Sequence, residues 1–136
     1  MNEQAQEILS PWEGAEVIHS YSRAQALEDG FLIDLSVWAK EAGFKFPLAV
    51  TQGVMSVLSP LPEIQAQGEN LVGRVWDMLN ILRHAIRTAK RTDEVHFAPL
   101  FTMQAGRKPE PVQLWAKCGP GDMGEPVISV MLEGED

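Results

Sequence analysis

Cysteine is almost absent from this sequence of 136 residues, which contains only Cys118. No disulfide can therefore form within one chain, and this composition favours a reducing, cytoplasmic setting. Long apolar runs are also missing, because no stretch approaches the roughly 18 residues that a membrane-spanning helix needs. The first ten residues, MNEQAQEILS, combine neither a basic start nor an apolar core, so we expect neither a secretory signal nor a membrane protein.

The motifs of familiar catalytic and metal sites are missing as well. His19, His84 and His96 do not have metal-ligand spacing, and no Cys-x-x-Cys or Gly-x-Ser-x-Gly motif occurs. The segment GPGDMGEP, residues 119–126, lacks a following Gly-Lys-Ser/Thr, so we interpret it as a tight turn and not as a phosphate-binding loop. The sequence indicates no base that would activate Cys118, which we interpret as a buried structural cysteine. No catalytic residue, metal or cofactor is expected.

Positive charge is scarce overall and concentrated in the middle of the chain. Eleven basic residues against 19 acidic ones give a net charge of -8. Residues 1–69 carry a net charge of −7, residues 70–109 carry +4, and residues 110–136 carry −5. Phosphate neutralisation supplies most of the affinity for duplex nucleic acid, so we expect no such partner. The basic middle is typical of a solvated helix face, and a local contact with an anion is the alternative.

Helix-start and helix-stop signals divide the first half into short units. The start signals are Ser22, Ser36 and Thr51, and the stop glycines are Gly30 and Gly43. Apolar segments between these signals predict short strands at residues 15–21, 31–34 and 44–50. The first half is therefore expected to consist of short strand-helix units.

The strongest helix signal covers residues 69–91 and is followed by a change to strand periodicity. The expected apolar stripe is Val72, Val75, Trp76, Leu79, Leu82, Ile86 and Ala89. The expected polar face is Arg74, Asp77, Asn80, Arg83, Arg87 and Arg91. Strands are predicted at residues 94–103, 111–118 and 126–132. We expect an α+β fold in which a C-terminal antiparallel three-stranded meander packs against the one long amphipathic helix.

The domain prediction is simple, and seven side chains are candidates for a ligand or partner site. Residues 1–11 are expected to form a tail or short helix, and residues 12–136 a single α+β domain. The candidates are His19, Tyr21, Arg23, Arg83, Arg87, Asp122 and Glu125. The first three gather where a strand is expected to pass into a helix, a common place for functional residues. The two later arginines share a helix face suited to a phosphorylated small molecule or an acidic protein, and the two acids lie at the predicted turn.

Two resemblances add expectations. Three segments are informative together: VIHSYSRAQALEDGFLIDLS, AGFKFPLAVTQGV and LWAKCGPGDMGEPVISVMLEGED. From about Glu16 to the C-terminus they resemble a family of small proteins of unknown function found in bacteria, plasmids and phages. This implies a stand-alone cytoplasmic protein of mobile-element character, with no catalytic residues. The opening stretch alone is similar to small ADP-ribosyltransferase-like domains, in which His19 and Ser20 would belong to an NAD site that a glutamate of the Glu133-x-Glu135 pair completes.

We therefore expect a non-enzymatic cytoplasmic binding or accessory protein that acts on a protein or on a small phosphorylated ligand. The absence of a complete catalytic constellation supports this expectation. A homodimer through exposed apolar area on the long helix stays open. One alternative is an NAD-dependent enzyme like the ADP-ribosyltransferases. Another is an acidic inhibitor that mimics nucleic acid, which the acidic flanks would favour.

Overall fold

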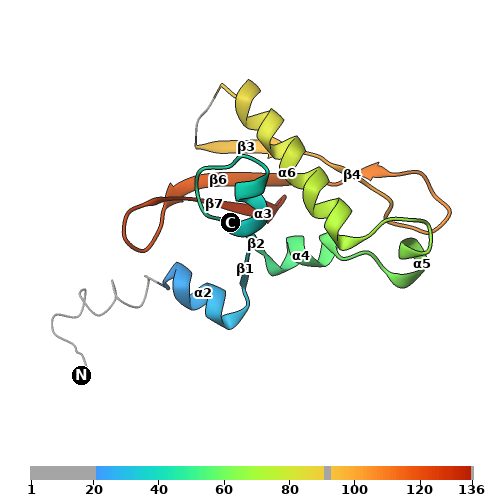
Figure 1. Ribbon diagram of the computed structural model, residues 1–136, viewed down its shortest axis with the longest axis horizontal. Helices are drawn as coiled ribbons and strands as arrows, with labels where there is room; N and C mark the ends of the chain where they lie inside the picture. Colours follow the sequence, from blue (N-terminus) through green and yellow to red (C-terminus); the bar gives the residue numbers. More distant parts are fainter. Residues whose placement is uncertain (1–20, 91–92, 136) are drawn as a thin grey trace.

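The computed structural model describes residues 21–90 and 93–135, and these form a mixed α/β fold (Figure 1). Its helices are α2 (Arg23–Asp29), α3 (Ser36–Glu41), α4 (Gln52–Leu58), α5 (Pro62–Gln65) and α6 (Leu71–Thr88). Its strands are β1 (Leu32–Asp34), β2 (Leu48–Thr51), β3 (Glu94–Phe97), β4 (Leu100–Phe101), β5 (Glu110–Pro111), β6 (Leu114–Pro120) and β7 (Pro126–Leu132). The predicted tail at residues 1–11, most of the first predicted strand, and Arg91 lie outside the described residues.

Strands from both halves of the chain form one five-stranded sheet in the order β1-β2-β7-β6-β3. β3, β6 and β7 pair antiparallel, whereas β2 lies parallel to β7 with Leu48 opposite Ile128. The sheet therefore extends beyond the three C-terminal strands that the sequence predicted. Local periodicity reports only which residues are extended, so it left the pairing between β2 and β7 undetected.

The strand predicted over residues 94–103 is interrupted. β3 ends at Phe97, and the chain passes through Ala98 and Pro99 before β4 pairs with β5 in a separate two-stranded ribbon. Proline has no N–H to donate to a ladder and is therefore unsuited to the interior of a sheet. The carbonyl of Pro99 still accepts a hydrogen bond from the N–H of Val112 at 2.9 Å. The prediction of a single strand is wrong at this proline.

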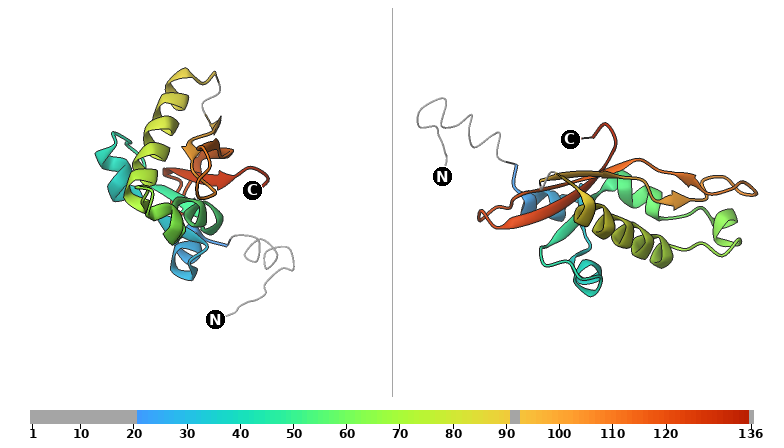
Figure 2. Two further views of the ribbon diagram at one scale, coloured as in Figure 1. Left: turned by 90° about the vertical axis from the view of Figure 1, so that its right-hand side faces the viewer. Right: turned by 90° about the horizontal axis from the view of Figure 1, so that it is seen from above.

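The hydrophobic core lies between one face of the sheet and helices α3, α4 and α6 (Figure 2). Its fully buried side chains include Leu48, Val50, Val54, Leu58, Met78, Leu79, Leu82, Leu114 and Val130. Each of these contributes about 1.5–3 kcal/mol relative to full exposure. The core thus ties the parallel pair of β2 and β7 to the long helix.

The face of α6 that is buried differs in part from the predicted stripe. Val72 and Ile86 are 49 and 41 % exposed, whereas Met78, which the stripe omitted, is completely buried. Arg74 was predicted on the polar face but is only 3 % exposed. The reason is tertiary, because the last turn of α4 and the chain after β4 pack against this part of the helix and contact Arg74.

Two of the three predicted helix caps are confirmed. The Ser22 hydroxyl accepts the N–H of Gln25 at 3.0 Å, and the Thr51 hydroxyl accepts the N–H of Val54 at 3.2 Å. Gly30 ends α2 with a φ of +83°, a left-handed conformation that favours glycine.

The prediction for Ser36 is wrong, because α3 begins at Ser36 and its N-cap is Leu35. The Ser36 hydroxyl instead accepts the N–H of Leu48 at 3.0 Å and donates to Asp34 at 2.5 Å. It therefore links α3 to β2.

Candidate functional site

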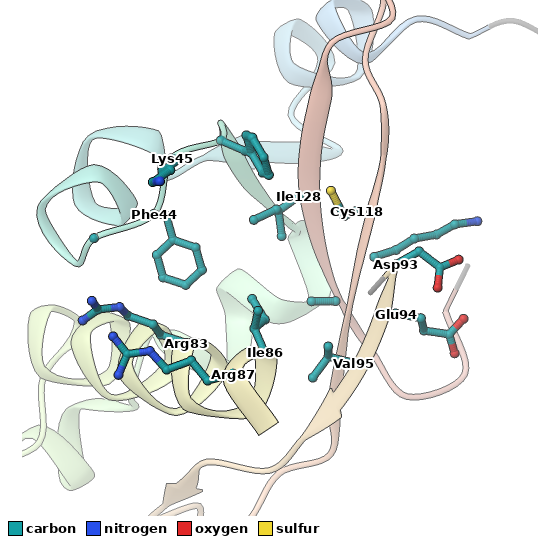
Figure 3. A pocket seen from close by; sticks show the side chains of 14 residues that line it. Phe44, Lys45, Arg83, Ile86, Arg87, Asp93, Glu94, Val95, Cys118 and Ile128 are labelled. Carbon is teal, nitrogen blue, oxygen red and sulfur yellow. The ribbon is translucent and has the colours of Figure 1, made fainter. Parts of the chain in front are cut away.

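A cavity of about 360 Å³ lies between the C-terminal half of α6, the connection from α3 to β2, and the sheet (Figure 3). Its lining includes Gly43, Phe44, Lys45, Arg83, Ile86, Arg87, Val95, Ala116, Cys118 and Ile128. The floor is apolar, and cationic side chains lie on the side of α6. An apolar hollow with a few polar groups at its edge is the usual form of a small-molecule site.

The cavity forms where the sheet continues beyond the helix that covers it. Alternate residues of β6 face the core, and their exposure rises along the strand. Leu114 is completely buried and Ala116 is 4 % exposed, whereas Cys118 is partly exposed. Because α6 ends at Thr88, it leaves this end of the sheet uncovered. Cys118 is therefore less buried than predicted: it packs against the core and also lines the cavity.

Four cations line this cavity, Lys45, Arg83, Arg87 and Lys117, together with the acids Asp93 and Glu94. Three of the cations, Lys45, Arg83 and Arg87, lie on α6 and on the α3–β2 connection. Arg83 and Arg87 lie four residues apart on α6 and therefore share a face, and Figure 3 shows both on the side of Phe44. Lys45 comes from the connection between α3 and β2. Within residues 21–90 and 93–135, none of the three side chains forms a hydrogen bond or ion pair. Three exposed charges without partners at one apolar hollow provide the positive potential that an anion needs.

The absence of a side chain at Gly43 leaves space for Arg83. A Cβ atom at Gly43 would lie 3.0 Å from Cζ and 3.1 Å from Nη2 of Arg83, so a larger residue would crowd the guanidinium. Gly43 also has a φ of +99°, which strains any other residue. A favourable interaction with the helix dipole explains the presence of only one of these cations. The dipole acts within the last turn of α6, where Arg87 lies, and stabilises a cation there by about 0.3–1 kcal/mol. Arg83 and Lys45 lie outside that turn.

Three of the other candidates are engaged in structural contacts at the start of α2. The carboxylate of Asp122 accepts the N–H groups of Arg23 and Ala24 at 2.8 and 2.9 Å. These two backbone hydrogen bonds lower the pKa of Asp122. The Arg23 guanidinium donates to the Ser129 hydroxyl at 2.7 Å and to the carbonyl of Ile128 at 3.0 Å. Arg23 and Asp122 therefore hold α2 against the turn between β6 and β7, where Glu125 accepts an N–H within the turn itself.

Tyr21 lines a second hollow of about 490 Å³ together with Arg23 and Asp122. The Tyr21 hydroxyl donates to Asp29 at 2.5 Å, and this hydrogen bond raises the pKa of Tyr21 to about 12. The Tyr21 ring contacts Phe31 edge to face, with 6.4 Å between ring centroids. His19 lies outside the described residues. The seven candidates thus divide into the two arginines at the cavity, four residues around α2, and His19.

The glutamates of the ADP-ribosyltransferase-like alternative contact different elements. Glu135 accepts the Thr51 hydroxyl at 2.8 Å and the N–H of Leu132 at 2.7 Å. Glu133 lies 3.3 Å from Nδ1 of His96. His19 and Ser20, the opening residues of that alternative, are outside the described residues, so the NAD site stays a prediction.

Residues 21–90 and 93–135 contain neither a metal-binding cluster nor a membrane-spanning helix. No group of three or more His, Cys, Asp or Glu side chains there is arranged to hold a metal ion. No helix there is long and apolar enough to cross a membrane.

Comparison with known proteins indicates a family but no activity. Neither a search of curated proteins nor a search of solved structures found a match. A family profile, in contrast, matches residues 9–136, which is most of the chain. The profile is that of a family of unknown function, and the chain therefore belongs to the family DUF6573.

Proposed function

We propose that this protein is a non-enzymatic binding protein and that its site is the cavity between α6, the α3–β2 connection and the sheet. The observation that carries the proposal is a set of three cations, Lys45, Arg83 and Arg87, that have no partner among the described residues and lie around an apolar floor. The ligand class that this arrangement favours is a small molecule with an apolar body and an anionic group.

The size of the cavity supports a small ligand. Small-molecule sites span about 300–1,000 Å³, and the volume of about 360 Å³ is near the lower end of that range. An apolar ring system would lie on Ile86, Ala116 and Ile128, and its burial would supply about 25 cal/mol per Å² of apolar surface. The anionic group would face the arginines.

Electrostatics decide the orientation of the ligand. A hydrogen bond to a charged group contributes about 1.5–3 kcal/mol, more than a neutral one. The guanidiniums of Arg83 and Arg87 are available because no carboxylate in the described residues pairs with them. Loss of both arginines should therefore weaken binding about 100-fold, at about tenfold for each 1.4 kcal/mol.

The probe for this proposal is 8-anilinonaphthalene-1-sulfonate, which joins aromatic rings to a sulfonate and fluoresces when it leaves water. The fluorescence titration compares the wild type with R83Q/R87Q. The matched control is R107Q/K108Q, which removes the same charge from exposed residues between β4 and β5, at the opposite end of the fold (Figure 1). Near-ultraviolet circular dichroism verifies that each variant is folded.

We expect saturable binding that is lost in R83Q/R87Q and retained in R107Q/K108Q. Alkylation of Cys118, the single cysteine, provides a second measurement, because a ligand in the cavity should shield its thiol from iodoacetamide. The proposal fails if the probe does not bind the wild type. It also fails if both double variants lose binding equally or if bound probe leaves the alkylation rate unchanged.

A further inference from the structure

We infer that the anionic group recognised at this cavity is a dianionic phosphate monoester carried on a small aromatic body. This inference rests on the proposed function and narrows it from any apolar anion to one class. It depends on the number, placement and freedom of the cations that line the cavity, and on the aromatic ring beside them.

Charge matching favours a dianion over a monoanion. The side chains that line the cavity carry four positive charges, on Lys45, Arg83, Arg87 and Lys117, and two negative charges, on Asp93 and Glu94. The partial negative charge of the α6 C-terminus, about −0.5, removes only part of the positive excess. A phosphate monoester carries a charge of about −1.5 to −2 at neutral pH, whereas a carboxylate or sulfonate carries only one negative charge. A ligand with the larger negative charge gains more electrostatic energy from Lys45, Arg83 and Arg87, which have no partner among the described residues.

The donor geometry also fits a phosphate. A phosphate monoester presents three terminal oxygens, and two arginines at i and i+4 can each direct a planar fork of N–H donors toward them. Gly43 leaves room for the Arg83 guanidinium in this position, because an added Cβ atom would lie 3.0 Å from its Cζ. Any other residue at position 43 would therefore displace this donor. Gly43 is thus a positioning residue for Arg83.

The aromatic preference comes from Phe44. Its ring lines the cavity beside the arginines (Figure 3) and is partly exposed, which leaves part of its surface available for stacking. Aromatic pairs in stacked or edge-to-face contact gain affinity beyond the burial of their area. A ring joined to a phosphate can therefore contact Phe44 and the arginines together.

Isothermal titration calorimetry with four probes tests the inference. The probes are 1-naphthyl phosphate, 1-naphthalenesulfonate, 1-naphthol and inorganic phosphate, measured at pH 7.5 and pH 5.0. We expect 1-naphthyl phosphate to bind at least about tenfold more tightly than the sulfonate at pH 7.5, a difference that corresponds to about 1.4 kcal/mol. Naphthol and inorganic phosphate, which each lack one half of the ligand, should both bind more weakly.

The pH dependence identifies the dianion. The second pKa of a phosphate monoester is about 6, so most of the ligand is a monoanion at pH 5.0 and its advantage over the sulfonate should disappear. The sulfonate keeps one charge at both pH values and reports any change in the protein itself. Binding of the sulfonate would reveal a change in the other charged or ionisable groups of the cavity. These groups are Asp93, Glu94, Lys117 and Cys118.

Two glycine variants test the positioning of Arg83. Gly43→Ala introduces a methyl group against Arg83, whereas Gly106→Ala has a similar positive φ of +77° but nothing within 4 Å of the new atom. We expect Gly43→Ala alone to reduce the preference for phosphate over sulfonate. This ratio is insensitive to a general loss of folded protein.

The outcomes separate the two proposals. If the sulfonate and the phosphate bind equally at pH 7.5, or if the phosphate advantage persists at pH 5.0, the inference of a dianion is overturned and the proposed function stands. If none of the naphthyl probes binds, both fail. An equal effect of the two glycine variants would overturn the role of Gly43.

Discussion

Replacing Arg74 by methionine removes the most extensively bonded side chain of α6. The Arg74 side chain is 4 % exposed, and its guanidinium donates to the carbonyls of Val57 at 2.7 Å and Thr102 at 2.6 Å. It also donates to the Glu69 carboxylate at 2.8 and 3.0 Å and lies 4.9 Å from the centroid of the Phe101 ring. Arg74 thus joins the last turn of α4, the segment before α6 and the chain after β4.

The expected loss of stability follows from the hydrogen-bond acceptors that methionine leaves without a donor. Methionine keeps an apolar stem of similar length but leaves two carbonyl acceptors without this donor, at about 1–3 kcal/mol each. The Glu69 side chain is 28 % exposed, so water replaces part of its lost partner. We expect Arg74→Met to lower the free energy of unfolding by about 3 kcal/mol, as is usual when one member of a buried ion pair is removed.

Urea unfolding measures this change, and Arg83→Met is the matched control. Arg83 is an exposed arginine on the same helix that has no partner among the described residues, so its replacement should change stability by less than about 0.5 kcal/mol. With a slope of about 1–3 kcal/mol per molar urea, Arg74→Met should lower the unfolding midpoint by about 1–3 M. Equal midpoints for the two variants would refute the assigned role of Arg74.

Three further changes test contacts elsewhere in the fold. Ser36→Ala leaves the N–H of buried Leu48 without its acceptor and should lower stability by about 1–2 kcal/mol in urea, and a change below about 0.3 kcal/mol would contradict this. Asp122→Asn should lower Tm at neutral pH. Because two backbone N–H groups of α2 lower the pKa of Asp122, its contribution is present above the ordinary pKa of 3.8 and is lost as the pH falls through the lower folded pKa. A Tm difference that persists at about pH 2 would count against that role. His96 has a raised pKa because hydrogen bonds from its ring to the carboxylates of Glu94 and Glu133 favour its charged form. Its contribution is therefore full below the ordinary pKa of 6.5 and is lost as the pH rises through the higher folded pKa. The Tm difference between wild type and His96→Gln should shrink as the pH rises above 6.5, and a constant difference would disprove this role.

Only some of the residues at the candidate site could be predicted from the sequence. The spacing of Arg83 and Arg87 placed them on one helix face, and the structure puts both at the cavity. Lys45, Phe44 and Cys118 were missed because they come from a loop and a strand that meet α6 only in the folded chain. The alternation along β6 was a usable signal, since it places Cys118 on the same face as Leu114 and Ala116.

The residues around the start of α2 were predicted from the sequence, but only the structure shows which groups they contact. Arg23, Asp122 and Glu125 were predicted as ligand or partner contacts because charged residues at a strand exit and at a turn are common in binding sites. In the structure, the Asp122 carboxylate accepts the N–H of Arg23, although 99 residues separate them in the chain. The Arg23 side chain in turn donates to the Ser129 hydroxyl on β7. Only the distance in space, which the sequence does not contain, distinguishes a docking contact within the chain from a contact with a partner.

Local chemistry alone determined where several elements begin and end. Ser22 and Thr51 cap helices with their hydroxyls, and Gly30 ends a helix in a conformation that other residues avoid. These interactions span three or four residues, so they are readable from the chain. The tertiary structure decided the parallel pairing of β2 with β7, the burial of Arg74 and the exposure of Arg83. Two arginines predicted on one polar face differ because other segments fold over only one of them, and that depends on contacts between residues far apart in the chain.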